Sequence, residues 1–314
     1  MVVVMINQDN IEKLYDVIDE SAIILYDKYK TPYLKGIVKT CENIYANSVS
    51  VSDEKINGEL EELLKSIKDI TFQKEEIRKA IQYAILKGLK HEKISNQMIT
   101  PESIGVMMSY FIQKLYDKKS FRIYDPLLGT GNLITTVANQ IDKDIELIGV
   151  ENFGISYELA HSLFDMLGYG DKVYFQDTLT SKNINADVVI SDFSAVQQDQ
   201  VYKIIDYQLN NLLADGYFIF MVDNTFFKAL NVKEFIKEIS ENWYLFGMVV
   251  LPNEVFKNQE KSMVILQNKG HNFIKPDSFL MAEIPSFNDK EGLNKVIIQL
   301  NNWFNKTQYY KVGE

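Results

Sequence analysis

Hydrophobic residues recur every three or four positions from Asn7 to about His91. The spacing is clearest in two groups: Ile11, Leu14, Tyr15 and Ile18, and Ile77, Ala80, Ile81, Ala84 and Ile85. Charged residues fill the other positions, so each segment has one apolar face, as an amphipathic helix does. We therefore expect a helical N-terminal domain over residues 1–94. Burial of the apolar faces in a bundle explains the pattern by itself, and docking of a protein partner on the charged faces is the alternative.

From about Glu92 onwards, short apolar segments alternate with amphipathic ones. The strand-like segments are FRIYD (121–125), ELIGVE (146–151), KVYFQD (172–177), DVVISD (187–192) and YFIFMVD (217–223). The helix-like segments are NLITTVANQI (132–141), ISYELAHSLFDML (155–167), VYKIIDYQLNNLL (201–213) and VKEFIKEIS (232–240). This alternation predicts an α/β fold with an open, mostly parallel sheet that helices cover on both faces.

The pattern changes again after residue 240. WYLFGMVVLP (243–252) and KSMVILQNK (261–269) are both strand-like, and no helical segment separates them. They predict an antiparallel pair that closes one edge of the sheet. We assign residues 95–314 to this second domain. Because ligands of open α/β sheets bind at the carboxyl ends of the strands, the residues that follow each strand are the candidates for a site.

The number of cysteines, the spacing of the histidines and the length of the apolar segments exclude several classes of protein. The single cysteine, Cys41, cannot form an internal disulfide, and the three histidines (His91, His161 and His271) have no metal-ligand spacing. The longest apolar stretches, such as YFIFMV, are far shorter than the roughly 20 residues that cross a bilayer. The N-terminal MVVVMI lacks the basic flank and cleavage site of a signal peptide. We expect a cytoplasmic protein with no metal site and no membrane segment.

The net charge of −10 bears on nucleic-acid binding. Proteins that bind nucleic acids usually carry a basic surface, because neutralising phosphates supplies much of their affinity. We therefore expect DNA binding by this chain alone to be weak.

Two closely spaced glycines follow the first predicted strand, in YDPLLGTGNL (124–133). Gly129 and Gly131 let the backbone approach a ligand, and the start of the next helix adds unpaired N–H groups. A dinucleotide site requires a third glycine where this chain has Ile134, and no G-K-[ST] of a phosphate-binding loop follows. Asp125 would repel a pyrophosphate but can accept hydrogen bonds from an ammonium group. The motif therefore favours a ligand with a cationic amino-acid end.

Acidic residues also end the next two predicted strands. Glu151 follows the glycine loop by about 20 residues, where an acid can accept hydrogen bonds from both ribose hydroxyls. Asp177 can accept one from an adenine amino group. A single acid at a strand end is an ordinary feature, but three at successive strand ends indicate a specific ligand. An adenosine with a cationic amino-acid tail is S-adenosylmethionine.

From about Asn96 to Lys269, over half of the chain resembles the N6-adenine DNA methyltransferases related to the modification subunit of type I restriction systems. It is most similar to their small stand-alone relatives in Gram-positive bacteria. NQMITPESIG (96–105) resembles the T-P segment that caps the methionine end of the cofactor in that family. DPLLGTGNL (125–133) resembles its D-P-x-x-G-[TS]-G motif. VVLPNEVFKNQEKSMVILQNK (249–269) resembles its late L-P-x-x-x-F strand and the K-S strand that follows.

The resemblance implies a Rossmann-like class I methyltransferase sheet behind an N-terminal helical domain, with S-adenosylmethionine as cofactor. The residues that it implies for cofactor binding are Thr100, Pro101, Asp125, Pro126, Gly129, Thr130, Gly131, Asn132, Glu151 and Asp177.

The catalytic motif of that family, [ND]-P-P-[YF], follows the fourth strand. Its acid or amide and the next carbonyl accept hydrogen bonds from the adenine amino group, and its aromatic ring stacks on the flipped base. The corresponding residues here are Asp192, Phe193, Ser194 and Ala195, so only the acid matches. Asp192 and the carbonyl of Phe193 are the catalytic candidates. A stacking ring would have to come from Phe193, Phe226 or Phe227.

After Lys269, only a strand-like FLMAEI (279–284) and a helix-like LNKVIIQLNNWFN (293–305) remain. Because this is too little for a DNA recognition domain, we expect sequence-specific action on DNA to need a partner. Three functions stay open: methyl transfer to adenine in DNA, transfer to a different acceptor, and a catalytically silent scaffold or regulatory subunit that binds the cofactor. A nicotinamide-dependent oxidoreductase rests on the sheet and the G-x-G alone, and Ile134 and Asp125 count against it.

Overall fold

A computed structural model gives the structure of the chain. It describes residues 6–95, 99–228, 233, 237, 240–256, 259–270, 273–309 and 311. The helix predicted at 232–240 falls outside these residues apart from positions 233, 237 and 240, and so do residues 96–98 of the T-P segment. The chain divides into two compact units that alternate along the sequence. The first unit comprises Met1–Glu102, Leu128–Asp142 and Gly149–Gln176, and the second comprises Ser103–Leu127, Lys143–Ile148 and Asp177–Glu314.

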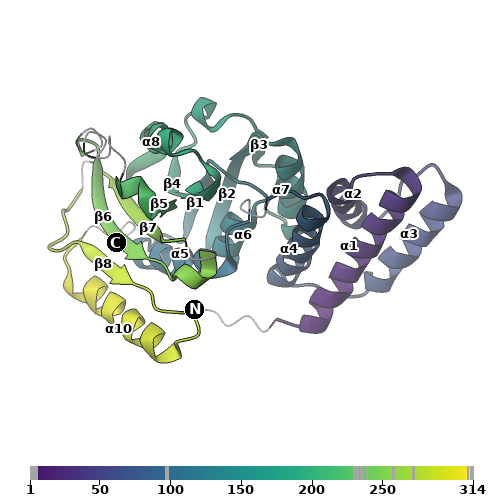
Figure 1. Cartoon of the computed structure of the whole chain (residues 1–314), viewed down its shortest axis with the longest axis horizontal. Coiled ribbons are helices and arrows are strands. Elements are labelled where there is room, and N and C mark those ends of the chain that lie inside the picture. Colours follow the sequence, from purple (N-terminus) through teal and green to yellow (C-terminus); the bar gives the residue numbers. More distant parts are fainter. Residues whose placement is uncertain are drawn as a thin grey trace. The chain divides into compact units, whose positions relative to one another are not determined.

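Four helices open the first unit, as the apolar spacing predicts (Figure 1). They are α1 (Gln8–Tyr29), α2 (Tyr33–Ala46), α3 (Glu54–Ile67) and α4 (Lys74–His91). Side chains satisfy the free N–H groups at two of the starts: Asn7 accepts from the backbone of Asp9, and Asp53 accepts from Lys55 and Ile56. The helical N-terminal region is confirmed.

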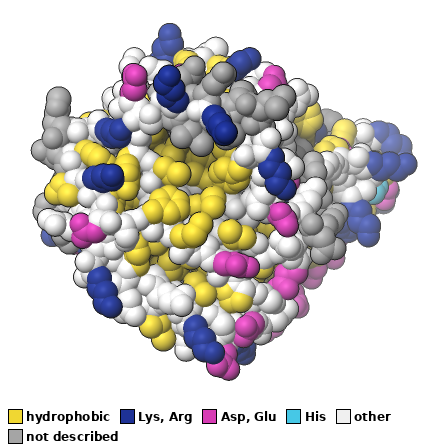
Figure 2. All heavy atoms as spheres, turned by 60° about the vertical axis from the view of Figure 1, so that its left-hand side comes forward, with side chains coloured by type: hydrophobic (Ala, Val, Ile, Leu, Met, Phe, Trp, Pro, Cys, Tyr) yellow, Lys and Arg dark blue, Asp and Glu magenta, His cyan; other side chains and the backbone are white. Residues whose placement is uncertain are grey.

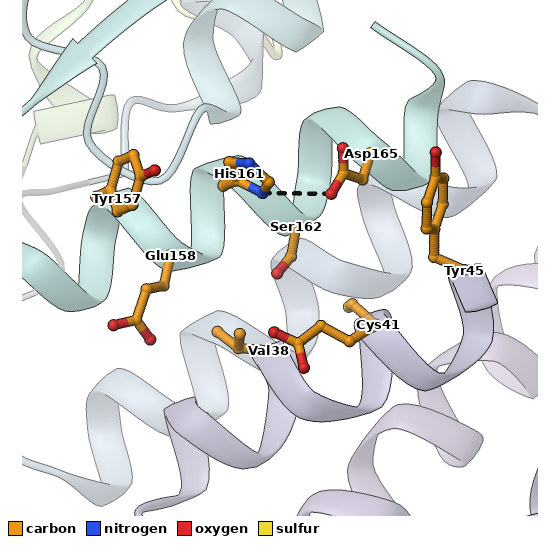
Figure 3. Close-up of a pocket in the computed structure, with 9 residues that line it drawn as sticks. Val38, Cys41, Tyr45, Tyr157, Glu158, His161, Ser162 and Asp165 are labelled. Carbon is orange, nitrogen blue, oxygen red and sulfur yellow. Dashed lines mark ion pairs between the residues drawn. The ribbon is translucent and has the colours of Figure 1, made fainter. Parts of the chain in front are cut away.

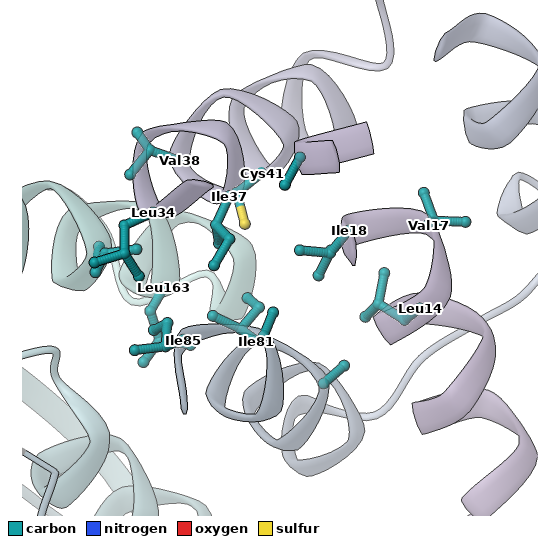
Figure 4. Close-up of a cluster of buried hydrophobic side chains, with 14 of the residues drawn as sticks. Leu14, Val17, Ile18, Leu34, Ile37, Val38, Cys41, Ile81, Ile85 and Leu163 are labelled. Atoms are coloured by element: carbon teal, nitrogen blue, oxygen red, sulfur yellow. The ribbon is translucent and has the colours of Figure 1, made fainter. Parts of the chain in front are cut away.

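The core of the first unit joins these helices to helix α7 (Gly154–Leu167). Ile18 on α1, Ile37 on α2 and Ile81 on α4 are almost fully buried, and Leu163 of α7 lies in the same cluster (Figure 4). Apolar burial of this kind is the main favourable term in folding. The apolar faces of the N-terminal helices are therefore buried partly against a helix that comes after the second predicted strand. The domain boundary between residues 94 and 95 stays a prediction.

Eight strands of the described residues form one sheet in the order β3-β2-β1-β4-β5-β7-β6-β8. The strands are β1 (Ser120–Asp125), β2 (Asp144–Glu151), β3 (Val173–Phe175), β4 (Ala186–Asp192), β5 (Leu212–Asp223), β6 (Trp243–Val250), β7 (Lys261–Asn268) and β8 (Leu280–Glu283). β1 pairs in parallel with β4, β2 with β3, and β4 with β5. The mixed α/β fold with a mostly parallel sheet is confirmed.

The expected antiparallel pair of β6 and β7 is confirmed, but it does not close the edge of the sheet, because β8 lies beyond it. β7 runs antiparallel to both β5 and β6, so β6 has the direction of the parallel strands. β8 then pairs in parallel with β6, with Met248 opposite Met281, and forms the edge of the sheet. The segment FLMAEI, which the sequence marks only as strand-like, thus extends the sheet by one strand.

Helices α5 (Glu102–Leu115), α8 (Gln198–Tyr207) and α10 (Lys290–Lys306) belong mainly to the second unit, and α6 (Asn132–Asn139) belongs to the first. α5 and α10 pack on each other through the rings of Phe111 and Phe304. Trp303 of α10 also contacts Phe246 of β6. Helix α10 therefore packs on β6 and also contacts α5.

Hydrophobic side chains gather on one face of the molecule, with charged side chains around them (Figure 2). In the second unit, Leu245 of β6 and Met281 of β8 are 44% and 67% exposed, and Ile298 of α10 is 55% exposed. Exposed apolar side chains are thus found on the last strands and the last helix of that unit.

Within the described residues, no helix combines the length and the apolar character needed to cross a membrane.

Candidate functional site

The order of the strands reverses at β1, which has β2 and β3 on one side and β4 and β5 on the other. Ligands of open α/β sheets bind outside the carboxyl ends of the strands at such a switch point. In the second unit, β1 and β4 run in parallel with Tyr124 opposite Val189. Asp125 is the last residue of β1 and Asp192 is the last residue of β4. The two acids therefore end neighbouring parallel strands at the edge where a ligand is expected.

Asp125 is 1% exposed, and Pro126 after it is also buried. Its Oδ1 accepts a hydrogen bond from the backbone N–H of Leu127 at 3.0 Å, so the side chain holds the first turn of the loop. A buried carboxylate is costly unless hydrogen bonds or a cation compensate it. Asp125 therefore anchors the start of the loop that follows β1.

The glycine loop has the backbone shape that the sequence predicts. Gly129 has a φ of +56° and Gly131 a φ of +79°, and residues with a Cβ rarely adopt such values. Gly131 donates to the carbonyl of Leu128 at 3.0 Å and is the residue at which α6 begins. Between them, Thr130 is 1% exposed, and its hydroxyl has no hydrogen-bond partner among the described residues. This segment offers both a close approach to the backbone and an unused buried donor.

Glu151, at the end of β2, holds the glycine loop in the first unit. Its Oε2 accepts from the N–H of Gly129 at 2.8 Å, and its Oε1 accepts from Asn152 at 2.9 Å and Phe153 at 2.7 Å. The carboxylate is partly exposed, and Oε2 keeps one accepting position beyond its bond from Gly129. Glu151 therefore orders the backbone around it and can still accept from a ligand hydroxyl.

Thr100 and Asn132 are both buried in the first unit, and they bond to each other. Asn132 donates through Nδ2 to the carbonyl of Thr100 at 2.8 Å and accepts through Oδ1 from Nη1 of Arg78 at 2.7 Å. Both polar ends of the Asn132 amide are thus engaged within the protein. Pro101 follows Thr100 and is half-buried. The side chain of Asn132 therefore serves as a link between segments, and sequence reasoning did not identify Arg78 as its partner.

Charge compensates the burial of Arg78. Burial lowers the pKa of the guanidinium, but hydrogen bonds and charges from Glu75 and Glu102 outweigh it and raise the pKa above its ordinary value. For Glu102, burial raises the pKa, and the charges of Arg78 and Lys79 outweigh it, so the pKa lies below its ordinary value. Arg78 and Glu102 are therefore both charged at neutral pH.

Asp177 lies two residues beyond the end of β3, because that strand ends at Phe175 and is shorter than the pattern suggests. The carboxylate is exposed and accepts from the N–H of Leu179 at 2.8 Å, which caps the short 3₁₀ helix η2 (Thr178–Thr180). The expectation that Asp177 ends a strand is wrong. It remains an exposed acceptor in the loop that follows.

Asp192 caps a second 3₁₀ helix, η3 (Phe193–Ala195), by accepting from the N–H of Ser194 at 2.8 Å. The hydroxyl of Ser194 in turn accepts from Nζ of Lys261 at 2.5 Å. Lys261 is the first residue of β7 and only 5% exposed, and its ammonium lies 5.2 Å from the centre of the Phe256 ring. The turn that follows β4 is therefore held by a buried lysine.

The ring of Phe193 is not placed to stack on a base. It is 3% exposed and packs against Phe218 and Phe220 of β5, with ring centres 6.2 and 5.4 Å away. Its carbonyl accepts from the N–H of Val196 at 3.0 Å and keeps a second lone pair. Phe226 is also buried, with its ring 4.9 Å from that of Tyr202. Phe227 is only partly buried and is therefore the most accessible of the three rings.

The sequence analysis did not identify two exposed aromatic rings in the first unit as candidates for ligand binding. Phe153, two residues after Glu151, is 50% exposed, and Phe175, the last residue of β3, is 60% exposed. The ring of Tyr157 lies 5.3 Å from that of Phe175. An aromatic residue two positions from the acid at a predicted strand end, after Glu151 and before Asp177, was the available signal. Such rings can contact the faces of a flat heterocycle.

A separate pocket of about 200 Å³ lies in the first unit and is lined by residues of α2 and α7 (Figure 3). Its lining includes Glu42 and Glu158, which pair with Lys39 and Lys35, and Asp165, which lies 3.2 Å from Nδ1 of His161. Among the described residues, no group of three or more His, Cys, Asp or Glu is arranged to hold a metal ion.

Comparison with known sequences finds two similarities. The profile of a family described as the YtxK N-terminal helical domain matches residues 12–89. The protein YtxK of Bacillus subtilis (strain 168), described as uncharacterized, is 26% identical over 325 residues, which cover 95% of this chain and 99% of that protein.

Comparison with solved structures gives the fold. A candidate class I S-adenosylmethionine-dependent methyltransferase from Listeria monocytogenes superposes with a TM-score of 0.86 at 29% identity, covering 95% of this chain and 100% of the other. A type I restriction-modification system methyltransferase subunit from Streptococcus thermophilus has a TM-score of 0.59 at 15% identity, covering 96% of this chain and 76% of the other. The chain has the fold of class I S-adenosylmethionine-dependent methyltransferases, with helices ahead of the sheet.

Proposed function

We propose that this chain binds S-adenosylmethionine and transfers its methyl group to an adenine amino group in DNA. The observation that carries the proposal is the position of Asp125 and Asp192 at the ends of the neighbouring parallel strands β1 and β4, in a fold shared with class I methyltransferases. One acid suits the cationic amino-acid end of the cofactor, and the other suits the amino group of the acceptor.

The residues present fit the cofactor. Asp125 would accept hydrogen bonds from its ammonium group, and the buried hydroxyl of Thr130 is available to its carboxylate. Glu151 would accept from the ribose hydroxyls, and Asp177 from the adenine amino group. Phe153 and Phe175 are exposed rings that can cover the faces of the adenine. When bound, the cofactor supplies an electrophilic methyl group on a sulfonium.

The acceptor amino group would be oriented by Asp192. Its carboxylate and the carbonyl of Phe193 are the two acceptors for the N–H groups of adenine, and they favour the pyramidal geometry in which the nitrogen lone pair attacks. The Ser194 N–H bond to Asp192 and the Lys261 bond to Ser194 hold this turn. Direct transfer would need no covalent intermediate on the protein: the thioether product would leave, and the proton released by the amino group would pass to the Asp192 carboxylate or to solvent.

A catalytically silent cofactor-binding scaffold is the second candidate. It is favoured by the buried ring of Phe193 and by the exposed Ala195, which together leave the turn after β4 without an aromatic surface. Transfer to an acceptor other than DNA is compatible with the same observation, because a smaller acceptor needs no stacking ring.

Action on DNA would require a partner. The chain carries a net charge of −10, which opposes binding to phosphates. The exposed charged faces of the N-terminal helices are the proposed docking surface for a protein that supplies DNA recognition.

Calorimetric titration with S-adenosylmethionine tests the first step. We expect micromolar binding by the wild-type protein and loss of binding in Asp125→Ala. A matched control is Asp53→Ala, which also removes an aspartate that accepts backbone N–H bonds but lies at the start of α3. Transfer of labelled methyl groups to DNA, assayed with and without a cell extract of the source organism, separates the enzyme from the scaffold. A folded wild-type protein that does not bind the cofactor would refute both candidates.

A further inference from the structure

Arg78 of helix α4 has no exposed surface, yet it is fully engaged in polar contacts. Its guanidinium donates to both carboxylate oxygens of Glu75, at 2.8 and 2.5 Å. It also donates to Gln82 on the same helix at 2.8 Å. A buried arginine is tolerated only when its charge and its donors are matched in this way.

Two further contacts reach beyond α4 to segments that follow it in the first unit. Nη1 donates to Oδ1 of Asn132, the first residue of α6, at 2.7 Å. Nη2 donates to Oε2 of Glu102 at 2.9 Å. Because Asn132 bonds to the carbonyl of Thr100, one guanidinium holds both the T-P segment and the end of the glycine loop.

A second bond between α4 and α6 strengthens the link. Nδ2 of Asn139, the last residue of α6, donates to Oε2 of Glu75 at 2.9 Å. Glu75 is 4% exposed and is shared between Asn139 and Arg78. Both ends of α6 are therefore tied to the helical domain through one buried ion pair.

We propose that Arg78 is a positioning residue through which the N-terminal helical domain sets the affinity for the methionine end of the cofactor. This inference rests on the proposed function. Arg78 does not touch the ligand: it holds Asn132 and Thr100 so that the two flanking segments keep one relative position. The helical domain is then part of the cofactor site, and a partner that displaces α4 weakens cofactor binding.

The test compares two ligands in three single variants and one double variant. Arg78→Lys keeps the charge but loses the fork of donors, and Asn132→Ala removes the link while leaving Arg78 with Glu75 and Gln82. Gln82→Ala is the matched control, because it removes a bond to the same guanidinium that leads to neither segment. Binding of S-adenosylmethionine and of adenosine is measured by calorimetry, where the stoichiometry reports the folded fraction.

We expect the first two variants to bind S-adenosylmethionine about tenfold or more weakly, with adenosine affinity nearly unchanged. Gln82→Ala should bind both ligands as the wild type does. The double variant Arg78→Lys/Asn132→Ala should be little weaker than either single one, because both changes break one link. If Arg78→Lys does not fold, Asn132→Ala decides.

Unchanged S-adenosylmethionine affinity in Asn132→Ala, or an equal loss for both ligands, would overturn the proposal. The first result would show that the network stabilises the fold without affecting cofactor binding. The second would show that it supports the whole ligand site and not specifically the methionine end. Failure of the wild-type protein to bind S-adenosylmethionine would instead refute the proposed function, so the two failures are distinguishable.

Discussion

The backbone N–H of Gly129 donates to Oε2 of Glu151 at 2.8 Å, across 22 residues of sequence. The glycine loop therefore takes its position from an acid at the end of the neighbouring strand. The same carboxylate accepts from the N–H groups of Asn152 and Phe153, so one side chain orders both the glycine loop and the backbone that follows β2. The loop and the acid depend on each other before any ligand binds.

Replacing Glu151 with glutamine should weaken cofactor binding. The new amide cannot accept from Gly129 while its oxygen bonds Asn152 and Phe153, because its NH₂ group is a donor. We expect S-adenosylmethionine to bind about tenfold or more weakly, which is roughly 1.4 kcal/mol. Calorimetric titration measures the change. Glu158→Gln on α7, where the acid pairs with Lys35 at the surface, serves as the control and should bind normally. Equal affinity in the two variants would contradict the role of Glu151.

Substitutions at Asp192 should separate transfer from cofactor binding. Asp192→Ala removes the acceptor for the amino group, and we expect no methyl transfer, with cofactor affinity within about tenfold of the wild type. Asp192→Asn keeps an oxygen that can accept from Ser194 and from the substrate, so it should retain measurable transfer. A filter assay with labelled cofactor compares the variants. Normal transfer by Asp192→Ala would show that another residue orients the acceptor.

Replacing Gly131 with alanine should lower both the free energy of unfolding and the affinity for S-adenosylmethionine. The backbone there has a φ of +79°, and holding a residue with a Cβ in the left-handed region costs about 1–2 kcal/mol. The added Cβ meets Ala160, Leu163 and Phe164 at ordinary contact distances of 3.5 Å, so no clash adds to this cost.

Gly168→Ala is the matched control for that change. Its φ is +70°, and the space around its Cβ is open. Both variants should lose a similar free energy of unfolding in urea titrations, but only Gly131→Ala should also bind S-adenosylmethionine more weakly. A normal affinity in folded Gly131→Ala would mean that the ligand does not approach this part of the loop.

The chemical reactivity of the Cys41 thiol should report unfolding of the protein. Burial, reinforced by the charge of Glu42, raises the pKa of its thiol from 9.0 to about 12. The native protein should therefore resist a thiol-reactive chromogenic disulfide at pH 8, and labelling should follow the urea unfolding curve. Rapid labelling of the native protein would contradict the burial of this thiol.

The raised pKa of the Cys41 thiol also makes the free energy of unfolding depend on pH. Above pH 9 the unfolded thiol loses its proton while the native one keeps it, so the native state binds more protons and the free energy of unfolding falls as the pH rises towards 12. Comparison of the wild type with Cys41→Ala across this range isolates the contribution of the thiol. An identical slope in both proteins would show that the thiol does not contribute.

The local pattern of apolar and polar residues predicted most of the helices and strands. The elements that it missed or misplaced have physical explanations. Helix α5 was missed because apolar residues lie on most of its surface, and burial on several sides hides the amphipathic spacing. The pair Leu212–Leu213 was read as the end of a helix but begins β5, since a short apolar pair fits either element. KVYFQD was read as a longer strand, although only residues 173–175 pair with β2.

By itself, the sequence determined the amphipathic helices, the parallel strands and the acids that end β1, β2 and β4, because periodicity and strand ends are local properties. It also determined the two glycines whose backbone shape no other residue adopts readily. Only the tertiary structure decided which groups meet. Arg78 reaches Asn132 across 54 positions and Lys261 reaches Ser194 across 67. The ring of Phe193 is buried because β5 presents Phe218 and Phe220 to it. Such pairings depend on how distant elements pack, and no spacing along the chain encodes them.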